Sequence, residues 1–384
     1  MRELSLPDWT KRGDVKAFIK DLVGESGMVH EPSTAATPRM MACLLGRGGL
    51  VDRERKSSLL SARDALQIVL EGVGGCRVGE VAGGGDVHGF LANNLSLVED
   101  PTADAGTMGA TVVEGWLEHS KTGFGRFLDI AGVTQSTGIE CAEALRRYWR
   151  ETGVRLTTSQ QAGMRVTRPD AWVLRVSLLG LTAEAFETLR GCMRRSTHTC
   201  VQNYTKSTLP DMETRMKSTG AGSQDKKYMN VAMGSSVDPG MAAFVAELKA
   251  HGVDARWLPA PLLLASTGGA KWPTLKTTGL AVGTSAENIT KLLKLAHLTV
   301  HKGGGVDPDL DVEIGREPKW TSHSLRRGAD TAAKRHQEES GASDASIDLF
   351  FGWQERVLLK AMQTHYMSLS IRERVKHARI TGFM

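Results

Sequence analysis

Apolar residues recur at helical spacing in three stretches of the chain. Positions 66, 69, 70 and 73 are apolar, so a helix is predicted over 61–75, with Ser61 as its N-cap and glycines at its end. The same spacing predicts helices over 138–153 and 285–300. The apolar face of the last helix is formed by Ile289, Leu292, Leu293 and Ala296.

Strand-like runs separate these helices. Two β-rich runs over 111–120 and 125–133 flank the short stretch "KTGF", which predicts a hairpin. Further strands are predicted over 170–180 and 227–236, and helices over 183–195 and 239–252. This alternation favours a small α/β insertion.

The pattern as a whole predicts a mixed α+β protein that is mainly helical, with a small antiparallel sheet. We expect a short N-terminal segment over 1–57, a first domain part over 58–154, the α/β insertion over 155–280, and a second part with a C-terminal tail over 281–384. Residues 205–227 are polar and rich in lysine, which is typical of a surface loop.

Composition and charge narrow the class of protein. The chain has 384 residues, of which 41% are hydrophobic, and its net charge of +5 is compatible with a nucleic-acid partner. No apolar run is long enough to span a membrane, and the N-terminus lacks a secretory signal. Five cysteines at no regular spacing favour a reducing compartment. We therefore expect an intracellular protein, in the nucleus of a eukaryote or the cytoplasm of a bacterium or its phage.

The stretch "TSHSLRRGADTAAKR" is helical and strongly basic. His323 and Arg326 lie three residues apart, so both side chains can reach one small anion from the same helix face. Arg327, Lys334 and Arg335 add charge nearby. Taken alone, these residues also fit an ordinary solvated basic helix.

Other short motifs occur on both sides of this helix. "GGCRVGEV" places Arg77 after a glycine turn, with Glu80 three residues later, and "EHSKTGFGRFLDI" places Lys121 at the hairpin tip. After the helix, "LFFGWQE" contains Trp353, and "MQTHYMS" contains Tyr366, the only tyrosine after Tyr228.

These five motifs, in this order, resemble the catalytic domain of the tyrosine recombinase or integrase family, enzymes that exchange DNA strands. The resemblance implies cleavage and rejoining of DNA, in site-specific recombination or in integration and excision of a mobile element, through a 3′-phosphotyrosyl intermediate. It also implies that neither a metal nor ATP is needed and that no cofactor is bound. The implied partners are double-stranded DNA and further copies of the chain, which assemble as a dimer or tetramer through the C-terminal tail.

The same resemblance assigns roles to the residues of the motifs. Two arginines can hold the oxygens of a phosphodiester in bidentate hydrogen bonds, a phenol can attack phosphorus, and an imidazole can move its proton. A lysine then protonates the departing oxygen, and an indole N–H adds one donor. The implied catalytic residues are Arg77, Arg326, Tyr366, His323, Lys121 and Trp353, with Glu80 as the residue that orients Arg77 or His323.

Several alternatives stay open at this point. Arg77 also fits a surface ion pair, Trp353 also fits the core, and Lys217, Lys226 and Lys227 compete with Lys121 as the acid. Candidate DNA-binding residues are Arg327, Lys334, Arg335, Lys226 and Lys227. The segment before residue 58 is short for a DNA-clamping domain, so it is a remnant or the end of one.

Rival functions share the same residues. A type IB topoisomerase or a hairpin-end resolving enzyme would use the same pocket to make a different product. A non-catalytic DNA-binding module could keep the fold without the reaction. A nucleotide-handling α/β enzyme centred on the insertion is disfavoured, because the chain lacks a phosphate-binding glycine motif with its lysine.

Overall fold

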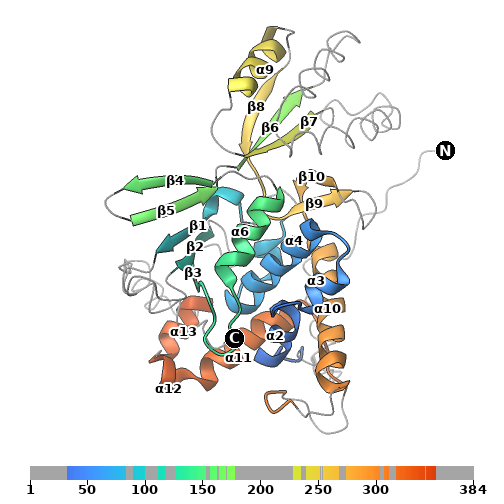
Figure 1. Ribbon diagram of the computed structural model, residues 1–384, viewed down its shortest axis with the longest axis vertical. Coiled ribbons are helices and arrows are strands. Elements are labelled where there is room, and N and C mark those ends of the chain that lie inside the picture. The colour runs from blue at the N-terminus through green and yellow to red at the C-terminus, as the bar shows by residue number, and fades with distance from the viewer. Residues whose placement is uncertain are drawn as a thin grey trace, which may run out of the picture. The chain divides into compact units, whose positions relative to one another are not determined.

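The computed structural model shows a protein of mixed helix and sheet (Figure 1). It divides into a unit Met1–Ser33 and a unit Thr34–Met384, and the second contains nearly all residues that the structure describes. The described ranges are 33–83, 90–99, 111–117, 126–152, 156–161, 164–169, 171–177, 228–234, 239–250, 252, 254–267, 274–302, 307–310, 317–341 and 343–351. The predicted mixture of helices with small antiparallel sheets is confirmed in this coarse form.

Helices supply most of the core. Their bounds are α2 Pro38–Leu45, α3 Leu50–Glu54, α4 Ser58–Ile68, the π-helix η2 Val69–Val73, α5 Val78–Val81, the 3-10 turn η3 Ala92–Asn94, α6 Cys141–Thr152, α9 Pro239–Ala250, α10 Val282–Lys302, α11 His323–Arg335, α12 Gln337–Ser340 and α13 Asp344–Phe351. None of them is both long and apolar enough to cross a membrane.

Within the described ranges, the strands form three antiparallel sheets. Their bounds are β1 Leu95–Glu99, β2 Thr111–Leu117, β3 Arg126–Ala131, β4 Leu156–Gln161, β5 Met164–Pro169, β6 Ala171–Ser177, β7 Tyr228–Gly234, β8 Ala255–Pro259, β9 Leu264–Thr267 and β10 Thr274–Gly279. The first sheet has the order β3-β2-β1-β5-β4, the second pairs β10 with β9, and the third has the order β7-β6-β8.

The predicted hairpin is present as β2 and β3. Their antiparallel register pairs Trp116 with Phe127, and these two rings lie on the solvent side with centroids 4.6 Å apart. The same sheet continues through β1 into β5 and β4, which fall after residue 154. It therefore crosses the predicted boundary between the first domain part and the insertion, while β6, β7 and β8 form a sheet of their own.

The hydrophobic core forms where α2, α4, η2, α6, α10 and α11 meet the buried side of β1–β3. Residues of the N-terminal segment contribute to it, since Met40, Met41 and Leu44 on α2 are fully buried. On α10 the predicted apolar face is confirmed, because the four predicted residues are all buried. Burial of these aliphatic side chains stabilises the fold by about 1.5–3 kcal/mol each.

The start of the helix predicted over 61–75 is corrected by the structure. Helix α4 begins at Ser58 after Ser57, so Ser61 is inside the helix and is not its N-cap. The Ser61 hydroxyl donates instead to the carboxylate of Asp52. The apolar spacing persists beyond Ile68, but the backbone widens there into the π-helix η2.

Candidate functional site: two arginines around one buried carboxylate

Glu80 joins the two arginines that the sequence singled out. Its Oε1 lies 2.7 Å from a terminal nitrogen of Arg77, and its Oε2 lies 4.0 Å from a terminal nitrogen of Arg326. Glu80 and Arg326 are buried, whereas the Arg77 side chain keeps about a fifth of its surface exposed. Two positive groups around one negative group leave a net positive charge, and Arg77 is the part of it that solvent reaches.

A tight turn aims Arg77 at this position. The π-helix η2 ends where the Gly74 N–H bonds to the Val69 carbonyl oxygen at 3.0 Å, and Gly75 follows with a φ of 60°. Arg77 then precedes α5, and its backbone N–H donates to Glu80 Oε2 at 2.9 Å. Glu80 thus accepts the N-cap N–H, as the glutamate of a capping box does, and its other carboxylate oxygen pairs with the Arg77 side chain.

Arg326 is fixed by groups that are distant in the sequence. Its guanidinium donates to the carbonyl oxygen of Gly75, 251 residues away, and to that of Phe351 at the end of α13. Its central carbon lies 5.9 Å from the centre of the Phe351 ring. One side chain therefore ties α11 to the arginine turn and to α13. Figure 1 shows α11 and α13 as neighbours, in agreement with their contacts.

Gly75 cannot carry a side chain without disturbing this arrangement. Its φ is positive, and a Cβ added there would overlap the ring of Phe351. We expect Gly75→Ala to destabilise the protein by about 2–4 kcal/mol, because left-handed backbone and steric overlap both cost free energy. Urea unfolding followed by circular dichroism measures this loss.

Gly79→Ala is the matched control for that experiment. Gly79 lies four residues further on in α5, and a Cβ there meets nothing within 4 Å. Alanine also favours helix by about 1 kcal/mol over glycine. If both variants lose stability equally, the special role of Gly75 is contradicted.

The other basic residues of α11 differ in exposure and in their partners. His323 is exposed at the first position of α11, and its backbone N–H bonds to Thr321 Oγ1 at 3.2 Å. Arg326, three residues on, turns inward instead. Arg327 is exposed, and no ion pair joins it to a residue that the structure describes.

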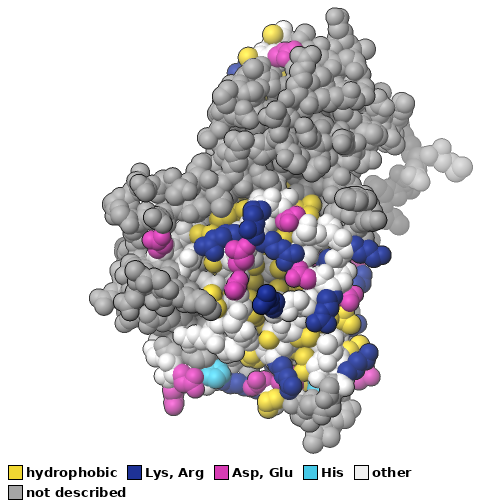
Figure 2. Space-filling model, viewed as in Figure 1, with side chains coloured by type: hydrophobic (Ala, Val, Ile, Leu, Met, Phe, Trp, Pro, Cys, Tyr) yellow, Lys and Arg dark blue, Asp and Glu magenta, His cyan; other side chains and the backbone are white. Residues whose placement is uncertain are grey.

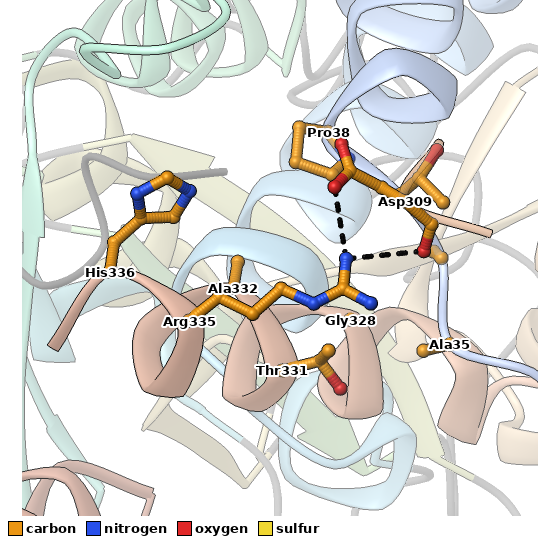
Figure 3. Close-up of a pocket in the computed structure, with 10 residues that line it drawn as sticks. Ala35, Pro38, Asp309, Gly328, Thr331, Ala332, Arg335 and His336 are labelled. Carbon is orange, nitrogen blue, oxygen red and sulfur yellow. Dashed lines mark hydrogen bonds and ion pairs between the residues drawn. The ribbon is translucent and has the colours of Figure 1, made fainter. Parts of the chain in front are cut away.

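Lys334 and Arg335 carry charges that the chain itself neutralises. Lys334 lies 3.3 Å from Asp330, one helical turn earlier. Arg335 contacts the side chain of Asp309 at 2.9 Å and its carbonyl oxygen at 3.3 Å, as the dashed lines in Figure 3 show. The small pocket in that figure is lined by α11, residues 35–38 and Asp309, and it contains none of Arg77, Glu80 and Arg326. Among the predicted DNA-binding residues on α11, Arg327 is therefore the one whose charge no described carboxylate neutralises.

Several predicted site residues lie outside the described part of the chain. These are Lys121, Trp353 and Tyr366 among the catalytic candidates, and Lys226 and Lys227 among the DNA-binding candidates. The competing Lys217 and the C-terminal tail after 351 are outside it too. Tyr148 is described, and it is a buried structural residue whose hydroxyl donates to the Leu262 carbonyl oxygen at 2.8 Å and accepts from the Leu264 N–H.

One buried polar cluster next to the site was missed by the sequence analysis. Glu71 in η2 is fully buried, and its Oε1 accepts a 2.6 Å hydrogen bond from the amide of Gln67, which also donates to Ser285 on α10. Burial raises the pKa of Glu71 to about 8, although the hydrogen bond from Gln67 opposes the shift. The available signal was Gln67 and Glu71, four residues apart, inside an otherwise apolar helical stretch.

Comparisons with known proteins do not indicate a family or a function for this site. No protein-family model matches the chain, and no curated protein and no solved structure matches it either. Within the described residues, no three histidine, cysteine, aspartate or glutamate side chains come together as a metal site would need. The site must therefore be interpreted from its own chemistry.

Proposed function

We propose that the protein cuts and rejoins DNA as a tyrosine recombinase does, through a covalent link between Tyr366 and a 3′ phosphate. The observation that carries the proposal is the meeting of Arg77 and Arg326 around Glu80, although 249 residues (326 − 77) separate them in the sequence. The sequence motifs around these two arginines predict such a pair. Their convergence is what an anion-binding centre built from those motifs requires.

The chemistry of a phosphodiester explains why such a centre is useful. Attack on phosphorus adds negative charge to the non-bridging oxygens, and guanidinium groups stabilise that charge at any working pH. Arg326 is held in position by the carbonyl oxygens of Gly75 and Phe351, and Glu80 holds Arg77. Donors fixed in advance cost little reorganisation during the reaction.

The proposed reaction forms one phosphoester bond for each one that it breaks. The Tyr366 oxygen attacks phosphorus, its proton passes to a base, for which His323 is the candidate, and the bond from phosphorus to the 5′ oxygen breaks. Lys121 gives a proton to that leaving oxygen, and Trp353 donates a hydrogen bond to the phosphate. Rejoining is the same sequence in reverse, so the proposed cycle consumes no nucleotide.

The burial of Arg326 also supports one rival, a DNA-binding module without activity. Its two bonds to backbone carbonyls stabilise the fold whether or not a phosphate is ever bound. The two readings differ in what happens to the DNA: the enzyme forms a covalent adduct, and the module only binds. A topoisomerase or hairpin-end resolving enzyme would form the adduct but release relaxed or hairpin-closed DNA.

The test uses supercoiled plasmid and nicked duplexes in EDTA at low salt, followed by denaturation and a search for protein–DNA adducts. We expect the wild type to form an adduct that peptide mapping locates at Tyr366, and we expect Tyr366→Phe to form none. Because the phenol is the nucleophile, the expected loss is complete. Tyr148→Phe is unsuitable as a control because that hydroxyl is buried and bonded, so Tyr228→Phe is used.

Each outcome separates the hypotheses. An adduct in Tyr366→Phe would overturn the assignment of the nucleophile. Binding without an adduct, on random DNA and on the natural flanking DNA, would favour the module. No binding to any DNA would overturn the proposed function.

A further inference from the structure

Helix α10 carries a row of lysines on the side that faces away from the core. The helix packs against α2, α3 and α5 through a side that includes Ile289, Leu292 and Leu293. Its opposite side is exposed. The exposed positions that share this side, given the helical repeat, are Glu287, Lys291, Lys294, Leu298 and Lys302.

The three lysines have no acidic partner among the residues that the structure describes. No ion pair joins Lys291, Lys294 or Lys302 to any carboxylate in the described ranges, even though Glu287 stands four residues before Lys291. Other cations at the surface, such as Arg147, Arg150 and Arg335, do pair with a described carboxylate.

Helix α6 shows the contrast. Its Arg147 and Arg150 pair with Asp52 and Glu143, and Figure 2 shows basic and acidic side chains intermingled over this helix. The lysines of α10 differ in this respect from the arginines of α6.

The row has the dimensions of a DNA contact. Lys291 and Lys302 are separated by about 16 Å at 1.5 Å per residue, which is about five base pairs of duplex at 3.4 Å each. Lysine heads on flexible stems can follow phosphates along that length without a fixed geometry. Leu298 lies between the lysines, where it can meet the sugar faces between phosphates.

The helix that carries the row also packs, through its other side, against an element of the arginine centre. Helix α10 contacts α5, the helix that carries Glu80, and Ser285 near its start accepts a hydrogen bond from Gln67, just before η2. A duplex lying along α10 would thus be held by an element packed directly against the turn of Arg77.

We propose that Lys291, Lys294 and Lys302 bind the phosphate backbone of double-stranded DNA along the exposed side of α10. This inference rests on the proposed function, since it names a part of the surface on which the substrate lies. In this role the lysines position the DNA through its phosphates and do not distinguish one base sequence from another.

The test compares two triple variants that remove the same charge. One is Lys291→Gln, Lys294→Gln and Lys302→Gln. The control is Arg146→Gln, Arg150→Gln and Arg256→Gln, three cations at least partly exposed that pair with Glu143 or Asp254. Binding of a random duplex is measured from low to physiological salt. Each phosphate contact contributes about 0.9 to the slope of log K against log salt.

We expect the lysine triple variant to lower that slope by about 2–3 and to weaken binding at least tenfold at low salt. The control should lower it by less than about 1. Both should unfold at the wild-type urea midpoint within error, because the altered side chains are on the surface.

The possible failures are distinguishable. An unchanged slope in the lysine variant, with wild type binding DNA and forming the Tyr366 adduct, overturns this inference and leaves the proposed function intact. Equal losses in both variants would mean that only net charge matters, and would overturn it too. A wild type that binds no DNA overturns the proposed function itself.

Discussion

Arg326→Ala should lower the free energy of unfolding by about 3–5 kcal/mol, because it leaves a buried ion-pair partner and buried carbonyls without their donor. The side chain is 7% exposed, and it bonds to the carbonyl oxygens of Gly75 and Phe351 beside the Glu80 carboxylate. Its loss would detach α11 from the arginine turn and from α13. Urea unfolding of wild type and variant gives the difference directly.

Arg327→Ala is the matched control, one residue away on the same helix. Arg327 is exposed and has no ion pair with a described residue, so its replacement should change stability by less than about 0.5 kcal/mol. If the two variants unfold at the same urea concentration, the anchoring role of Arg326 is contradicted.

Arg326→Lys separates the structural role from the chemical one. Lysine keeps the positive charge, but it lacks the planar fork that bonds two carbonyl oxygens at once. Under the proposed function, we expect adduct formation to slow by about 10²–10³, the usual cost of removing a donor that stabilises the transition state. A folded Arg326→Lys protein with wild-type adduct rates would show that the guanidinium takes no part in the reaction.

The elements with strong periodicity could be predicted from the sequence. The apolar face of α10 and the β2–β3 hairpin were predicted correctly, because burial on one side imposes a regular spacing that neighbouring residues share. Strands β4 and β5 were not predicted. β4 reads "LTTSQQ", so it joins the sheet through backbone pairing with β5 and not through a pattern of apolar side chains.

The candidate site was predictable in part. The motifs indicated Arg77, Glu80 and Arg326 as a group, but not that Glu80 would contact both arginines. That contact depends on a π-helix, a left-handed glycine and the end of α13, each set by tertiary packing. His323 and Arg326 were predicted to reach one anion from the same helix face. In the structure the Arg326 guanidinium points inward, where it bonds to a backbone carbonyl oxygen, whereas His323 is exposed.

The stability of the protein should fall as pH rises from about 5 to about 8, and Glu71→Gln should remove most of this dependence. Burial raises the pKa of Glu71 to about 8 from its ordinary value of 4.5. The folded protein therefore keeps a proton that the unfolded chain releases above 4.5. Stability from this group is fully present below that ordinary pKa and is lost as pH rises through the folded one.

The contacts of Glu71 explain why the protonated form suits the folded state. Gln67 Oε1 and Glu71 Oε2 are both buried, and neither has a hydrogen-bond partner in the described structure. An ionised Glu71 adds only acceptors to this cluster, whereas a protonated one adds the missing donor. Glutamine keeps the size of the side chain and supplies a donor at every pH.

Unfolding free energies from pH 5 to pH 9 test this prediction. We expect the wild type to lose on the order of a few kcal/mol across the range relative to Glu71→Gln. Glu338→Gln, at an exposed position on α12, should keep the wild-type dependence. Parallel curves for wild type and Glu71→Gln would contradict the burial of a neutral carboxyl. The π-helix η2 leads directly into the turn of Gly75 and packs against α11. A confirmed effect would therefore mean that the elements which hold Arg77 and Arg326 become less stable in alkaline solution.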